Sequence, residues 1–174
     1  MKILETKRLL LRYLVPSDIN SLWALYRDPE VSQYIPDAPR TYSEAKEELE
    51  WFQNGHPKHP QLGLWATIYK ESGKLIGRCG LLPWTIDGQP EIEVAYLIAK
   101  AYWGQGLGTE AARAILDYGF DKLHLPRLIC LIDQDNLASA TVAKHIGMAF
   151  EKEWKHDLGA FLLYSRSKEP NPGH

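Results

Sequence analysis

Cysteine is scarce in this sequence: Cys79 and Cys130 are the only two, and neither has the spacing of a metal or redox motif. No disulfide framework is indicated, and a cytoplasmic protein is expected. Charge of one sign is not in excess either, because the formal net charge is −2 and no dense run of Lys or Arg occurs. This argues against direct binding of nucleic acid. No apolar run is long enough to cross a membrane, and charged residues interrupt the first eight positions, so no signal peptide is expected.

The composition is that of an ordinary globular protein, with 45% hydrophobic and 24% charged residues. A chain of 174 residues is long enough for one domain with a sizeable core. We expect this domain to span residues 1–168 and the stretch 169–174, which is rich in proline, to form a flexible tail. His56 and His59 lie in a loop between prolines and are expected to be solvated, so no metal site is predicted.

Apolar periodicity predicts strands and helices arranged as one α+β domain. Strands are expected at 9–14, 64–69, 74–84, 94–98, 128–132, 150–154 and 160–165, and helices are expected to start near 15–18, 41–44, 109 and 136, whereas 30–40 reads as irregular. Short turns at 71–73 and 87–90 predict antiparallel neighbours, and the helix that follows strand 94–98 predicts a right-handed parallel crossover. The expected fold is a mixed central sheet of about six to seven strands flanked by about four helices.

The stretch 91–110 is the most informative part of the sequence. Residues 94–98 read as a strand that is buried on both faces, and Gly104, Gly106 and Gly108 follow it at alternate positions. A helix starts next, so its unpaired N–H groups and the positive end of its dipole face the loop. The pattern predicts a site for an anion such as a phosphate. The spacing fits neither the P-loop, G-x-x-x-x-G-K-[ST], nor the dinucleotide fingerprint, G-x-G-x-x-G.

The segment Trp103-Gly104-Gln105-Gly106-Leu107-Gly108 resembles the acetyl-CoA loop of the GNAT N-acyltransferase superfamily, [RQ]-x-x-G-x-[GA], with Trp103 in place of the usual Arg or Gln. Its tyrosine-tryptophan-glycine opening, followed by Thr109-Glu110-Ala111, is similar to the branch of ribosomal-protein N-terminal acetyltransferases (RimJ/RimL-like). Segments 5–12, 28–31, 135–139 and 146–148 match the same branch in order. The resemblance covers nearly the whole chain and implies a GNAT-like fold and N-acetyltransferase activity.

This resemblance implies acetyl-CoA as the donor and assigns residues to its binding. The N–H groups expected to bind the pyrophosphate belong to Gly104, Gln105, Gly106, Leu107 and Gly108, with Thr109 at the helix start. The pantetheine arm is expected to pair with backbone near Ile98 and to form a hydrogen bond with Asn136. Asn136 also stands where a helix N-cap is wanted, so capping is an alternative or additional role.

The resemblance further implies direct attack of an amine on the acetyl thioester, without a covalent enzyme intermediate. Glu93 is the implied base that removes the amine proton; a surface or ion-paired carboxylate is the alternative, and Glu91 is a weaker candidate. Many members carry a tyrosine that protonates the departing thiolate at the position of Ala143, so that donor is absent here. Ser139, on the same predicted helix, is implied as its replacement, unless it only serves the helix backbone.

The acceptor is expected to be the amine of a protein N-terminus or of a small molecule. It should enter between the N-terminal helices and the later strands, with Trp23, Tyr34, Trp84 and Tyr96 as candidates for its walls. Two other functions stay open: a non-catalytic acyl-CoA-binding sensor or interaction module and, less favoured, a nucleotide-binding domain. The branch resemblance implies a monomer or a homodimer.

Overall fold

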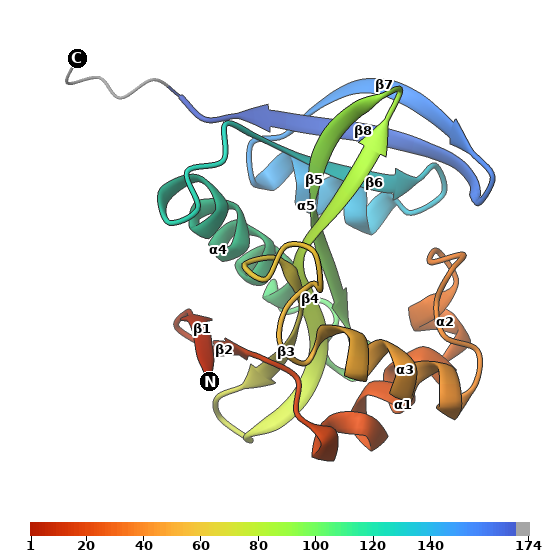
Figure 1. Ribbon diagram of the computed structural model, residues 1–174, viewed down its shortest axis with the longest axis vertical. Coiled ribbons are helices and arrows are strands. Elements are labelled where there is room, and N and C mark those ends of the chain that lie inside the picture. Colours follow the sequence, from red (N-terminus) through yellow and green to blue (C-terminus); the bar gives the residue numbers. More distant parts are fainter. Residues whose placement is uncertain (170–174) are drawn as a thin grey trace.

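Residues 1–169 are described by a computed structural model (Figure 1). The predicted flexible tail, 169–174, lies outside the described residues apart from Glu169. The strands are β1 (Lys2–Glu5), β2 (Leu9–Arg12), β3 (Gly63–Tyr69), β4 (Lys74–Ile86), β5 (Gln89–Ile98), β6 (Arg127–Asp133), β7 (Ala149–His156) and β8 (Gly159–Ser167). The α-helices are α1 (Ile19–Arg27), α2 (Pro29–Ser32), α3 (Tyr42–Phe52), α4 (Leu107–Asp121) and α5 (Leu137–His145), and Pro16–Asp18 and Lys100–Tyr102 form short 3₁₀ turns. Over residues 1–169, no helix has both the length and the apolar character needed to cross a membrane.

The eight strands of residues 1–169 form one sheet in the order β1-β2-β3-β4-β5-β6-β8-β7. Neighbouring strands are antiparallel, except for β5 and β6, which are parallel. The predicted β3–β4 hairpin, the antiparallel pairing of β4 with β5 and the parallel crossover through α4 are confirmed. The α+β class with a mixed central sheet is therefore confirmed as well.

Two short elements were not predicted. Strand β1 raises the number of strands to eight; it is four residues long, lies at the edge of the sheet and has exposed ends, so no clear apolar alternation marks it. Helix α2 lies in the region that was expected to be irregular. Asp28 caps it by accepting a hydrogen bond from the Glu30 N–H, and Pro29 occupies its first turn. Edge pairing and local capping form these elements, and periodicity detects neither.

Helices cover both faces of the sheet (Figure 1). Helix α4 packs on one face through side chains with no exposed surface, among them Ile115 and Leu116, and α5 contributes to the same apolar cluster. Helices α1 and α3 pack on the opposite face through a second cluster that includes Leu22 and Leu49. Strands β4 and β5 therefore separate two helical layers.

Candidate active site

The parallel strands β5 and β6 separate along most of their length. They share one register pair, Glu93 with Ile129, whereas β5 pairs with β4 over its whole length, Gln89–Ile98. The gap that opens beyond Glu93, here called the wedge, leaves one edge of β5 facing α5 instead of a neighbouring strand.

Backbone groups of β5 point into the wedge. The Ala99 N–H donates to the Ile76 carbonyl oxygen at 2.7 Å, and this contact shows which residues of β5 direct their backbone groups toward β4. Because bonded and non-bonded pairs alternate in an antiparallel ladder, Tyr96 and Ile98 direct their N–H and C=O groups away from β4. The indole Nε1 of Trp103 donates to the Ile98 carbonyl oxygen at 2.8 Å. At Ile98 the carbonyl is therefore occupied, and the Ile98 N–H and the backbone of Tyr96 are the groups that face the wedge.

The glycine loop leads into an open helix terminus. Gly104 and Gly106 have φ angles of 75° and 76°, a conformation that glycine adopts without strain. Helix α4 begins at Leu107, before the expected start at Thr109, and no side chain of the described residues caps it. A Cβ added at Gly104 would meet no atom within 4 Å, so the space above the loop is open. An uncapped N-terminus below an open glycine loop is the geometry that binds an anion.

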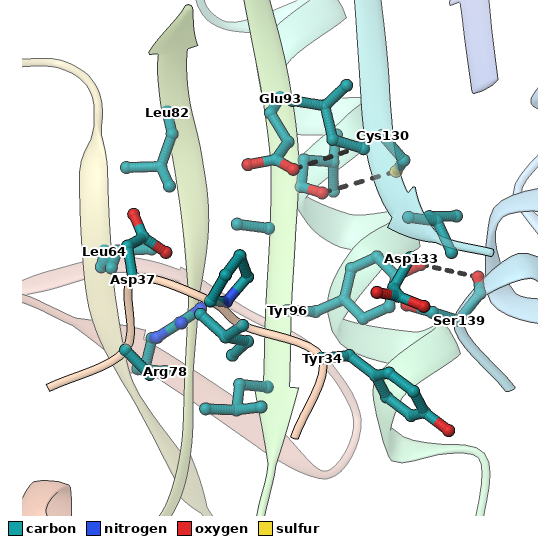
Figure 2. Close-up of a pocket in the computed structure, with 18 of the residues that line it drawn as sticks. Tyr34, Asp37, Leu64, Arg78, Leu82, Glu93, Tyr96, Cys130, Asp133 and Ser139 are labelled. Atoms are coloured by element: carbon teal, nitrogen blue, oxygen red, sulfur yellow. Dashed lines mark hydrogen bonds between the residues drawn. The ribbon is translucent and has the colours of Figure 1, made fainter. Parts of the chain in front are cut away.

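A cavity of about 360 Å³ opens at the wedge and is lined from both helical layers (Figure 2). It brings together Glu93, Asn136 and Ser139, three of the predicted site residues. The glycine loop and Ile98 do not line it. Figure 2 shows Asp37 on the β4 side of β5 and Ser139 on the β6 side, so the cavity extends across β5.

Glu93 lies at the closed end of the wedge, where β5 and β6 meet. Trp84 Nε1 donates to its Oε1 at 3.2 Å, and the Leu131 N–H donates to its Oε2 at 3.3 Å. Burial raises the pKa of the Glu93 carboxyl to about 7, against the lowering effect of these two hydrogen bonds and of Arg78. A carboxylate that ionises near neutral pH is suited to accept a proton during a reaction.

Hydroxyl and thiol groups border the wedge near α5. The Tyr96 hydroxyl crosses from β5 and donates to the Ser139 carbonyl oxygen at 2.8 Å. The Ser139 hydroxyl itself bonds to no residue within 1–169, so it does not serve the helix backbone. Cys130 Sγ lies 3.4 Å from the Val94 carbonyl oxygen, and burial raises the pKa of this thiol well above its usual value, so it is protonated. Ala143, where the expected tyrosine is absent, is fully buried in the core.

The remaining predicted residues divide between the cavity and other places. Asn136 caps α5, because its Oδ1 accepts from the Ser139 N–H at 3.1 Å, and it lines the cavity as well. Glu91 lies outside the cavity and pairs with Arg127 at 3.1 Å. Of the four aromatic candidates for the acceptor walls, Trp23 packs in the apolar cluster of α1 and α3, and the other three line the cavity.

Sequence reasoning missed a buried charged group on β4. Arg78 is 7% exposed, lines the cavity and donates through Nε to the Tyr26 hydroxyl at 2.8 Å. The Tyr26 hydroxyl in turn donates to Glu48, so β4, α1 and α3 are joined by one chain of hydrogen bonds. Burial acts to lower the pKa of Arg78, but Tyr26 and Glu48 outweigh it and raise the pKa, so the guanidinium stays charged. The available signal was an arginine between Gly77 and Gly80 inside an otherwise apolar strand.

Comparisons with known proteins agree with this geometry. A model of the acetyltransferase (GNAT) domain family matches residues 8–149. The YkkB protein of Bacillus subtilis (strain 168) is 34% identical over 162 residues, which cover 91% of this chain and 93% of that protein. The N-acetyltransferase p20 of Bacillus licheniformis is 31% identical over 155 residues, which cover 88% of this chain and 84% of that protein. A solved GNAT-family acetyltransferase from Bacillus anthracis has a TM-score of 0.79 at 24% identity over 95% of this chain and 96% of that one, a likeness of fold.

Proposed function

This chain belongs to the GNAT acetyltransferase family and is an N-acetyltransferase, and from that premise we propose that it transfers an acetyl group from acetyl-CoA directly to a primary amine. The acceptor is the α-amine of a protein N-terminus or a small-molecule amine, and donor and acceptor bind together in a ternary complex. The motifs at 103–111 and 135–148 support a place in the RimJ/RimL-like branch. The comparisons lend no support to a non-catalytic acyl-CoA-binding role.

The observation that carries this proposal is the position of Glu93. Its carboxyl, with a pKa of about 7, lies at the closed end of the wedge, where the cavity joins the two helical layers. A donor on the α4 and α5 side and an amine on the α1 and α3 side meet beside this one base. Direct transfer is further supported by Cys130, the thiol of the cavity, because a buried protonated thiol is a poor nucleophile.

The α4 side has the features that fit acetyl-CoA, which supplies an activated thioester. The N–H groups from Gly104 to Thr109, at the uncapped start of α4, bind its pyrophosphate. The backbone of Tyr96 and the N–H of Ile98 pair with the pantetheine arm along the wedge. Asn136 binds the same arm through its side-chain amide nitrogen, because its Oδ1 is engaged in capping α5.

Different residues around the wedge remove the amine proton and protonate the departing thiolate. Glu93 accepts the proton that the amine loses, directly or through a water molecule. The neutral amine nitrogen then bonds to the acetyl carbon, and the bond from this carbon to sulfur breaks. Ser139 donates a proton to the departing thiolate and regains one from the nitrogen, which loses its second proton as it becomes the amide. A backbone N–H of β5 stabilises the oxyanion between these events. An α-amine, with a pKa of about 8, needs less help from the base than a lysine amine at about 10.4.

Thermal unfolding with acetyl-CoA, coenzyme A, ATP and NADP tests this proposal. A ligand at about a hundred times its dissociation constant adds about 2.7 kcal/mol to the free energy of unfolding, which raises the Tm by roughly 5–10 °C. We expect this rise with acetyl-CoA and little change with ATP or NADP, followed by thiol release when amines are added. The absence of a rise with both coenzyme A species would overturn the proposal.

A further inference from the structure

The cavity contains a cationic site on the side of α1 and α3 that the proposed chemistry does not use. We infer that Arg78 binds a carboxylate of the acceptor, so that the substrate is a small amino carboxylate, such as a free amino acid, rather than a plain amine or a protein N-terminus. This inference rests on the proposed acetyl transfer and names the class of its acceptor.

Most of the hydrogen-bonding capacity of Arg78 is unused. Its Nε donates to Tyr26, but its two Nη groups form neither a hydrogen bond nor an ion pair with any residue of the described chain. Arg78 is 7% exposed, and its Nη groups border the cavity without being sealed in the protein interior. A buried guanidinium with unmet donors is unfavourable. Its planar fork matches the two oxygens of a carboxylate.

Within residues 1–169, no carboxylate neutralises this guanidinium by direct contact. Glu48 is connected to Arg78 only through the Tyr26 hydroxyl, and burial raises the pKa of Glu48. Asp37 also lines the cavity, but it is exposed and forms no ion pair with Arg78 within residues 1–169. Arg78 therefore remains available to an anionic group that enters from the cavity.

The position of Arg78 relative to Glu93 suits a molecule with two ends. In the β4–β5 ladder Arg78 pairs with Leu97 and Leu82 pairs with Glu93, so Arg78 and Glu93 project from the same face, four positions apart along the strands. At about 3.4 Å per residue their backbones lie roughly 14 Å apart. The two long side chains shorten this distance, and a cavity of about 360 Å³ leaves room for a molecule of amino-acid size.

The charges around the cavity also suit an amino carboxylate. Arg78 is the cation, Glu48 lines the cavity beside it, and the carboxylates of Asp37, Glu93 and Asp133 line the cavity as well. This distribution is complementary to a zwitterion whose carboxylate contacts Arg78 and whose amine points toward Glu93. The carboxylate takes no part in the reaction: the amine nitrogen replaces sulfur on the acetyl carbon, Glu93 takes the amine proton, and the thiolate is protonated.

Matched acceptors test this inference through coenzyme A release. The protein amino acids are compared with their carboxamides, with the corresponding decarboxylated amines and with short peptides. We expect the amino acids to have a kcat/KM at least tenfold above their matched amides and amines. Arg78→Met should lower kcat/KM about 10- to 100-fold for the amino acids and less than about threefold for amides and amines, with Arg78→Lys between. Arg27→Met, which changes an exposed arginine of α1, is the control.

Binding measurements keep the test independent of turnover. The rise in Tm with acetyl-CoA verifies that Arg78→Met is folded, and titration of amino acids against wild type and Arg78→Met measures carboxylate binding directly. Equal activity toward all acceptor classes, a uniform loss in Arg78→Met, or a preference for peptides would overturn the inference. If acetyl-CoA neither binds nor turns over, the proposed function fails, and the amino-acid titration alone decides on the Arg78 site.

Discussion

Replacing Glu93 with glutamine has two opposite consequences, both of which follow from its buried carboxyl. Burial raises the pKa from 4.5 to about 7, so between these values the folded protein binds a proton that the unfolded chain releases. The folded state therefore loses stability as the pH rises through this range, at about 1.4 kcal/mol per pH unit. Above pH 7 the total loss is about 3 kcal/mol. Glutamine carries no charge and avoids this loss.

We expect Glu93→Gln and wild type to differ little at about pH 5 and the variant to be more stable by up to about 3 kcal/mol at about pH 8, which raises its Tm by roughly 6–12 °C. The gain is smaller if the glutamine NH₂ faces the Trp84 or Leu131 N–H donor. Over the same range kcat should fall about 100- to 10,000-fold, because the general base is removed. The wild-type rise in rate near pH 7 should disappear with it.

Thermal unfolding and initial rates between about pH 5 and pH 8 measure both effects. Glu91→Gln is the matched control, since Glu91 lies on the same strand but pairs with Arg127 outside the cavity. It should show no stability gain that grows with pH. A constant difference in Tm between Glu93→Gln and wild type across the range, or a variant with full kcat, would refute the assignment of Glu93 as the base.

Four further substitutions test the rest of the site. Gly106→Ala places a β-carbon at a φ of 76°, so it should lower the Tm by roughly 2–4 °C and raise the KM for acetyl-CoA. An unchanged Tm and an unchanged KM would contradict the role of the loop in binding acetyl-CoA. Ser139→Ala should lower kcat about tenfold or more while the Tm is retained, and full kcat in this variant would exclude Ser139 as the proton donor. Tyr96→Phe removes the hydrogen bond to the Ser139 carbonyl oxygen and should lower the free energy of unfolding by about 1 kcal/mol. Cys130→Ala should keep most of the activity, and an acyl adduct trapped on Cys130 and detected by mass spectrometry would contradict direct transfer.

The sequence predicted the features that one continuous stretch encodes. Strand β5, the loop with Gly104 and Gly106 and the start of α4 follow one another in the chain, and each has its own local signal. The hairpins and the parallel crossover followed from the lengths of the connections between strands. Local signals therefore yielded the order of the elements and the candidate anion site.

Features that join distant segments could not be predicted from the sequence. The chain from Arg78 through Tyr26 to Glu48 links three elements whose approach depends on the packing of α1 and α3 against β4. The wedge depends on where the β5–β6 register ends, and the crossing of Tyr96 to α5 depends on the wedge. The pKa of Glu93 likewise depends on its burial, which only the assembled site provides.

The sheet consists of two parts that are joined by one register pair. Strands β1 to β5 form the first part and β6 to β8 the second, and the pair of Glu93 with Ile129 joins them. The position of the proposed base relative to both parts is therefore set at the pair that joins them. The backbone groups proposed to bind the donor, at Tyr96 and Ile98, lie beyond this pair, where β6 no longer pairs with β5.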